Sequence, residues 1–90
     1  MLYMVIERFK EGAAKPVYRR FRDHGRLMPE GLAYVDSWVA EDFGCCYQIV
    51  DCPDPSLLEV WTEAWADLID FEFHPVMPSK DAFEALTPEL

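Results

Sequence analysis

Positive charge is scarce in this sequence, and almost all of it lies in the first half. Residues 46–90 contain one lysine and ten acidic residues, residues 1–45 are balanced, and the net charge of the chain is −9. A chain this acidic repels phosphate backbones and anionic lipid headgroups. We therefore expect neither nucleic acid nor a membrane as a partner. The cluster Arg19, Arg20 and Arg22 could meet a local anion, although a solvated helix face also explains it.

Long apolar runs are also missing. No stretch approaches the roughly 20 apolar residues that a membrane helix needs. The apolar start, Leu2–Phe9, has neither a charged leading segment nor a small-residue cleavage site, so it does not resemble a signal peptide. The three cysteines are an odd number, and without an export signal we expect them to be reduced thiols. These features predict a cytoplasmic protein.

The sequence lacks the common motifs for metals and phosphates as well. It has no C-x-x-C or H-x-x-x-H spacing, and the adjacent Cys45 and Cys46 would point to opposite faces of a strand. It has no glycine-rich phosphate loop and no nucleophile elbow. Nothing in the sequence favours a thiol nucleophile paired with His74, or a haem held by His74 or His24. We therefore expect no metal and no cofactor.

What is present is a clear order of local patterns. Strand-like and amphipathic helical runs alternate as β-α-β-β-α-β, which is the ferredoxin-like order. It predicts a single α+β domain over residues 1–90, an antiparallel sheet with helices on one face only. The predicted elements are the strand Leu2–Phe9, the helix Lys15–Leu27, the strands Leu32–Val39 and Cys45–Cys52, the helix Leu57–Leu68 and the strand Phe71–Val76.

The second face of this sheet needs a partner. Hydrophobic residues make up 51% of the chain and aromatic residues 14%, while a chain of this size buries only roughly 60–65% of its unfolded surface. The strand Leu2–Phe9 is apolar on both faces, as in a strand that is covered on both sides. The two helices can cover only one face. We therefore expect a homodimer that pairs through the helix-free sheet face.

Individual residues refine this prediction. Trp61 and Trp65 lie four positions apart on the apolar stripe of the second helix, and we expect both to pack on the sheet. Pro75 indicates that the last strand lies at an edge or ends there. Ser79 can cap a short final helix, Lys80–Leu86, whose apolar side chains are available to pack.

Four segments carry a resemblance to a known family: YMVIERF, VYRRFRDHGR with PEGL, YVDSWV, and WADLIDFEFHPV. Over about residues 2–78 the chain resembles a family of small bacterial proteins that is classified as a domain of unknown function. This resemblance implies the dimeric alpha-beta barrel superfamily, in which ferredoxin-like subunits pair sheet to sheet. Relatives by fold include cofactor-free monooxygenases, muconolactone isomerases and haem-degrading enzymes. The family has no established catalytic residues to carry over, and fold alone does not fix function.

In such a dimer the helix-free face would line the barrel interior, where a polar side chain marks a candidate site because its burial is unfavourable unless it is paired. Glu72 and His74 share one strand face, opposite Phe71 and Phe73, which we assign to the helices. The two could form an acid/base pair. A histidine that is satisfied by a neighbour at the sheet rim is the simpler alternative.

Three further residues are candidates for binding a ligand. Glu7 could be a base or an anchor, or a strand-end carboxylate that reaches water, and Gln48 could line a cavity or be a hydrogen-bonded core amide. Either Trp38 or Ser37 reaches the cavity, depending on strand register. The sequence thus predicts a protein that binds a small organic ligand in the barrel interior. The alternatives are a cofactor-free monooxygenase or isomerase that uses His74, Glu72 and Glu7 on a planar substrate, and a purely structural interaction module.

Overall fold

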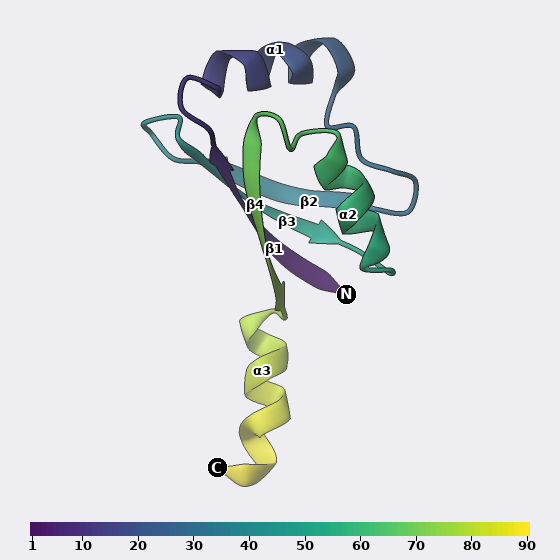
Figure 1. Cartoon of the computed structure of the whole chain (residues 1–90). Helices are drawn as coiled ribbons and strands as arrows, with labels where there is room; N and C mark the ends of the chain where they lie inside the picture. The colour runs from purple at the N-terminus through teal and green to yellow at the C-terminus, as the bar shows by residue number, and fades with distance from the viewer.

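The computed structural model describes all 90 residues and shows one antiparallel sheet with α1 and α2 on the same face (Figure 1). The strand order β2-β3-β1-β4 confirms the predicted α+β, ferredoxin-like fold. The sheet is open, so one chain does not close into a barrel. The elements are β1 (Leu2–Phe9), α1 (Ala14–His24), β2 (Ala33–Val39), β3 (Cys45–Asp51), α2 (Ser56–Glu63), β4 (Ile69–Val76), α3 (Ser79–Leu86) and a 3-10 turn (Thr87–Glu89).

The first helix is shorter than the sequence pattern predicted. It ends at His24 instead of Leu27, because Gly25 adopts a φ of 69° and donates its N–H to the carbonyl of Phe21 at 2.8 Å. A glycine with positive φ is a common helix terminator. Leu27 also has a positive φ, of 58°. Arg26 therefore lies outside the helix, although the sequence pattern predicted a helix through Leu27.

The second helix is also shorter, ending at Glu63, and residues 64–68 continue as turns. Just before this helix, Asp54 Oδ1 accepts a hydrogen bond from the Ser56 N–H at 3.0 Å. The last strand, β4, begins at Ile69, two residues earlier than predicted, and lies at the edge of the sheet as Pro75 indicated. None of the helices is both long and apolar enough to cross a membrane.

Strand register decides which side chains lie beneath the helices. Val5 in β1 lies opposite Gln48 and Phe73, and Glu7 lies opposite Cys46 and Phe71. This face packs against the helices, and the aromatic rings of β4 pack there as the alternation predicted. The core cluster consists of Tyr3, Val5, Ala13, Val17, Leu32, Val50, Cys52, Leu58, Trp61, Trp65 and Ile69.

The opposite face of the sheet is not covered by α1 or α2 and carries a group of apolar side chains. We call it the open face and define it by Met4, Ile6, Trp38, Tyr47 and Ile49, which the register places together. Trp38 is 57% exposed and Tyr47 is 42% exposed. The single chain therefore leaves these apolar side chains without a cover, and charged or polar residues, Arg8, Asp36, Glu72 and His74, share the same face.

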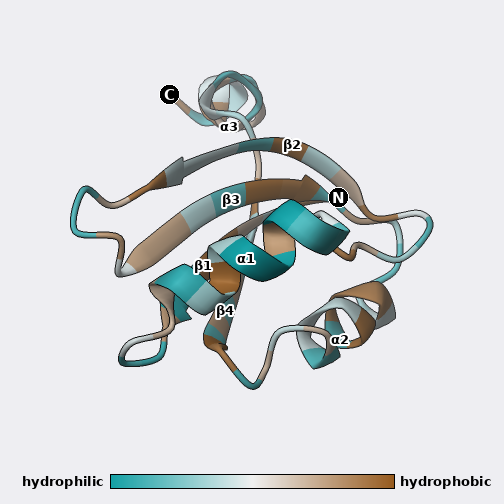
Figure 2. Ribbon diagram, turned by 90° about the horizontal axis from the view of Figure 1, so that it is seen from above, coloured by the Kyte–Doolittle hydropathy of each residue, from teal (hydrophilic) through white to brown (hydrophobic).

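The last helix, α3, projects away from the sheet (Figure 1). Viewed from above, α1 and α2 lie on one side of the sheet and α3 on the other (Figure 2). Ser79 is its first residue and makes no capping hydrogen bond. The apolar side chains of Phe83 and Leu86 remain 64% and 56% exposed. The open face and the exposed apolar side chains of α3 thus lie on the same side of the sheet, opposite α1 and α2 (Figure 2).

Candidate functional site

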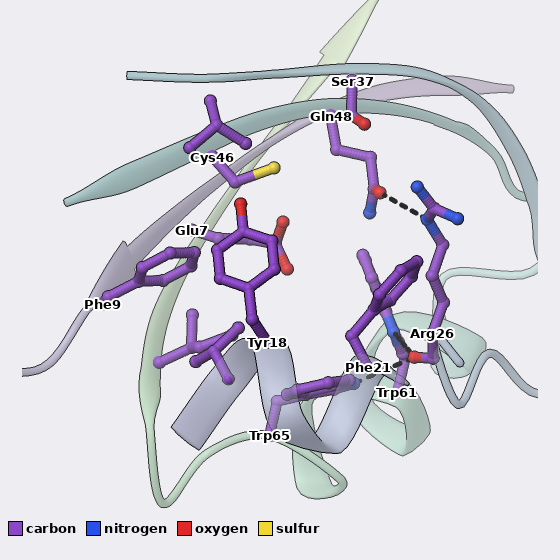
Figure 3. Close-up of a pocket in the computed structure, with 13 residues that line it drawn as sticks. Glu7, Phe9, Tyr18, Phe21, Arg26, Ser37, Cys46, Gln48, Trp61 and Trp65 are labelled. Atoms are coloured by element: carbon purple, nitrogen blue, oxygen red, sulfur yellow. Dashed lines mark hydrogen bonds between the residues drawn. The ribbon is translucent and has the colours of Figure 1, made fainter. Parts of the chain in front are cut away.

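A pocket of about 220 Å³ lies between the sheet and α1, on the helix-covered face (Figure 3). Its floor comes from β1, β2 and β3, which supply Glu7, Ser37, Cys46 and Gln48. Its walls are mostly apolar, from α1, the α2 region and the ends of the strands. Polar groups on the floor of an apolar pocket are the usual composition of a small-molecule site.

The pocket exists because α1 packs loosely on the sheet. Val17 is the only buried residue of this helix, while Tyr18 and Phe21 line the pocket and stay 42% and 40% exposed. Beneath them the sheet carries Glu7 and Cys46 as cross-strand neighbours, where larger apolar side chains would fill the space. The pocket thus results from the side chains of both α1 and the sheet, which together do not fill the space between them.

Glu7 is the most unusual residue of the pocket. Only 7% of it is exposed, and its carboxyl makes no hydrogen bond to a nitrogen or oxygen of the chain, with only the weakly donating Cys46 thiol as a hydrogen-bond partner. Neither oxygen is fully occluded, so both reach the pocket. Burial raises the pKa of Glu7 above its ordinary value, and Cys46 and Arg26 offset part of this rise. A carboxyl of this kind can hold or release a proton toward a ligand.

Cys46 and Tyr18 surround this carboxyl. Burial, together with the negative Glu7, raises the pKa of the Cys46 thiol to about 12. Because the thiolate is the reactive form, Cys46 is a poor nucleophile at neutral pH. Burial, followed by Cys46 and Glu7, also raises the pKa of Tyr18, whose hydroxyl points toward the pair in Figure 3. The floor therefore holds three protic groups that are neutral when Glu7 is protonated.

Arg26 closes the other end of the pocket and is held at both ends. Its backbone carbonyl accepts hydrogen bonds from the indole N–H groups of Trp61, at 3.0 Å, and Trp65, at 2.9 Å. Its guanidinium carbon lies 3.7 Å from the centre of the Tyr34 ring, and its Nε donates to Gln48 Oε1 at 3.2 Å. The side chain is thus fixed by stacking and by a hydrogen bond.

Gln48 and Ser37 complete the polar floor. Gln48 is 3% exposed, and its amide nitrogen has no partner in the chain but is open to the pocket. A bulge between Tyr34 and Asp36 sets the register of β2, which turns Ser37 toward the pocket and Trp38 toward the open face. The Ser37 hydroxyl shares a hydrogen bond of 2.8 Å with the Tyr34 hydroxyl. The register therefore places Trp38 on the helix-free face, where the sequence analysis expected the cavity, and Ser37 in the pocket beneath α1.

Glu72 and His74 lie together on the open face, outside the pocket. Their side chains are hydrogen-bonded to each other, and Arg8 Nη1 donates to Glu72 Oε1 at 2.7 Å. His74, followed by Arg8, lowers the pKa of Glu72. Both side chains are about half exposed. The structure thus separates Glu72, His74 and Trp38 from Glu7 and Gln48. No group of three or more His, Cys, Asp or Glu side chains is placed to hold a metal ion.

Reasoning from sequence did not single out three pocket residues, Tyr18, Arg26 and Cys46. Arg26 fell inside the predicted helix, which was expected to continue past Gly25 to Leu27. Gly25 was the sequence signal that could have shown the end of the helix before Arg26, since glycine is a frequent helix terminator. Tyr18 lies in α1, and its role depends on how far that helix stands from the sheet.

The fold and this site define a small α+β protein with a polar-floored apolar pocket beneath one helix. The chain belongs to the family described as Domain of unknown function (DUF3303), whose model matches residues 1–90. This agrees with the resemblance carried by the sequence segments. Comparison with the curated proteins finds no match, and comparison with the solved structures finds none either.

Proposed function

We propose that this protein binds a small planar organic ligand in the pocket between α1 and the sheet. The observation that carries the proposal is Glu7, a buried carboxyl without a nitrogen or oxygen partner that opens into an apolar pocket. Its oxygens stay open to the pocket, where water or a ligand can satisfy them. We propose that a ligand supplies this partner.

The size and lining of the pocket limit the ligand. Ligand pockets commonly span roughly 300–1,000 Å³, so a pocket of about 220 Å³ suits a molecule of one or two rings. Tyr18, Phe21 and Trp65 offer flat apolar faces around the space. Aromatic walls hold planar molecules by stacking and by burial of apolar surface.

A pocket-filling variant tests this proposal. We expect a set of one-ring aromatic fragments, such as indole and phenol, to shift the backbone amide resonances of Glu7, Cys46 and Gln48 in the wild type. Val39→Trp should abolish these shifts, because Val39 lines the pocket from β2. Val35→Trp is the matched control, on the same strand and outside the pocket. Shifts confined to the open face, or unchanged in Val39→Trp, would rule out the pocket.

A second candidate function is isomerisation of such a ligand without a cofactor. Burial raises the pKa of Glu7 and favours this function, because a more basic carboxylate takes a proton more readily from one substrate carbon and can return it to another. The monooxygenase alternative needs O₂ as co-reactant. Exchange of a bound ligand's C–H protons with D₂O, present in wild type and absent in Glu7→Gln, would distinguish catalysis from binding alone.

We also propose that two chains pair through the open face. An isolated helix shorter than about 12–15 residues is marginal in water, yet α3 spans only Ser79–Leu86 and has its apolar side chains exposed. The apolar open face lies on the same side of the sheet. A two-fold dimer is the simplest way to cover them, because a single interface between identical chains can bury the open face and the apolar side of α3 of both chains.

The dimer can be tested with one charged substitution. Tyr47 lies in β3 on the open face, so Tyr47→Lys should weaken dimerisation roughly thirtyfold or more, as truncation of a central aromatic anchor does. Val60→Lys, which adds the same charge on the exposed surface of α2, is the control and should leave the dimer intact. Sedimentation equilibrium at micromolar concentration measures both. A monomeric wild type under these conditions would overturn the proposal.

We propose a cytoplasmic location as well. All three cysteines are free thiols, and Cys46 and Cys52 are buried. Free thiols persist in reducing compartments, whereas exported proteins commonly carry disulfides. The thiols thus support this location.

A further inference from the structure

We propose that the ligand of this pocket is a planar organic acid that binds with its carboxylate on Arg26 and a neutral polar group at Glu7. The inference deepens the proposed binding function and rests on it. It starts from an unpaired charge. Three of the other four arginines pair with a carboxylate, the fourth, Arg19, is exposed, and Arg26 is half-buried with no carboxylate partner. In a chain with a net charge of −9, an unpaired half-buried guanidinium needs an explanation.

The guanidinium is already held in place for an anion. Stacking on Tyr34 and the Nε contact with Gln48 fix its plane, and two indole N–H groups fix its backbone. The two terminal nitrogens have no partner in the chain, and Arg26 lines the pocket. A planar guanidinium with free terminal N–H groups matches the geometry of a carboxylate. Because little freedom remains to be lost, binding there is favoured.

Glu7 sets the direction of the ligand. A ligand carboxylate placed beside Glu7 would bring two like charges together in a buried site, which is unfavourable. The anionic end therefore belongs at Arg26. Figure 3 shows Gln48 between Arg26 on one side and the Glu7, Cys46 and Tyr18 groups on the other. A hydroxyl or carbonyl on the far end of the ring can then exchange a hydrogen bond with Glu7, and the open amide nitrogen of Gln48 can donate to the ligand.

A cationic ligand does not fit this arrangement. Arg26 lines the same pocket and forms no salt bridge with a carboxylate, so it would repel the charge of such a ligand. A wholly neutral ligand would leave the terminal guanidinium nitrogens unpaired while it displaced the water around them. A carboxylic acid with one polar substituent satisfies both ends of the pocket, so hydroxy- or oxo-substituted aromatic acids are the class that the geometry favours.

Two compounds of the same shape test the assignment. Isothermal titration calorimetry should compare 4-hydroxybenzoate with the neutral 4-hydroxybenzamide. We expect wild type to bind the carboxylate about ten- to a hundredfold more tightly, the range expected of a charge-assisted hydrogen bond. Arg26→Met keeps most of the apolar stem and removes the charge, so it should bind both compounds equally. Arg19→Met makes the same change on the exposed face of α1 and should keep the preference.

The outcomes separate this inference from the proposed function. Equal binding of the two compounds to wild type, or a preference that persists in Arg26→Met, overturns the acid class while pocket binding stands. A second outcome also overturns the acid class and leaves pocket binding intact. In it, 4-hydroxybenzoate does not bind, but neutral fragments bind and Val39→Trp abolishes their binding. If no aromatic compound binds, both proposals fail. Should Arg26→Met not fold, the Nε–H resonance of Arg26 in the wild type decides, because only the carboxylate should shift it.

Discussion

Replacing Trp61 by alanine is expected to lower the free energy of unfolding by about 3–5 kcal/mol, as for other fully buried tryptophans. Trp61 is 2% exposed and packs edge-on against Phe71, with ring centres 5.5 Å apart. Its indole N–H also donates to the Arg26 carbonyl. Small domains have total stabilities of about 5–15 kcal/mol, so this one substitution should remove a large share of the stability.

Urea denaturation followed by far-ultraviolet circular dichroism measures this loss. Val60→Ala is the matched control, because Val60 precedes Trp61 in α2 and is 53% exposed. Its loss should stay within about 0.5 kcal/mol, as for surface substitutions in general. A loss below about 1 kcal/mol for Trp61→Ala, set against the range for core tryptophans, would mean that α2 does not anchor the core as the structure shows.

Alternation along the strands was predictable from the sequence, and it gave the correct face for several residues. Phe71 and Phe73 pack against the core beneath the helices, and Glu72 and His74 lie on the opposite face. The reason is that side chains on a strand alternate with a strict period of two, so one correctly assigned residue fixes the rest. Element order and the edge position of β4 followed from the same local patterns.

The location of the pocket did not follow from local patterns. The barrel resemblance placed the cavity on the helix-free face, whereas the pocket of the single chain lies beneath α1. Its volume depends on how far α1 stands from the sheet, which is a property of tertiary packing. The place of Arg26 depends on the positive φ angles of Gly25 and Leu27. The choice between Ser37 and Trp38 depends on a bulge in β2, and sequence alternation does not reveal such a bulge.

Replacing Glu7 by glutamine is expected to raise the free energy of unfolding at pH 8 by about 1–3 kcal/mol, the range for a buried polar group without a partner. Burial raises the pKa of Glu7 in the folded chain above its value in the unfolded chain. Protonated Glu7 therefore contributes stability that is fully present below the unfolded pKa. That contribution is lost as pH rises through the folded pKa. Glutamine has no charged form, so the Glu7→Gln variant does not lose this stability as pH rises.

The difference in stability between Glu7→Gln and wild type should consequently grow from pH 4 to pH 8. The titratable groups that face Glu7 are Tyr18, Cys46 and Arg26. The pKa of Tyr18 is raised and that of the Cys46 thiol is about 12, so neither of these two groups titrates in this range. Groups elsewhere titrate in both proteins and cancel in the difference.

Urea denaturation of both proteins at pH 4, 6 and 8 gives this difference, and Glu59→Gln controls for loss of a carboxyl at an exposed position of α2. A difference that is constant or shrinks with pH would show that the Glu7 carboxyl is solvated or paired in solution. The expected result has a functional meaning. An amide would fill the same space with less unfavourable burial, so a carboxyl at this position lowers stability at neutral pH, as binding and catalytic residues commonly do. Glu7→Gln should therefore be more stable than wild type and yet lose the proton-dependent part of ligand recognition in the pocket.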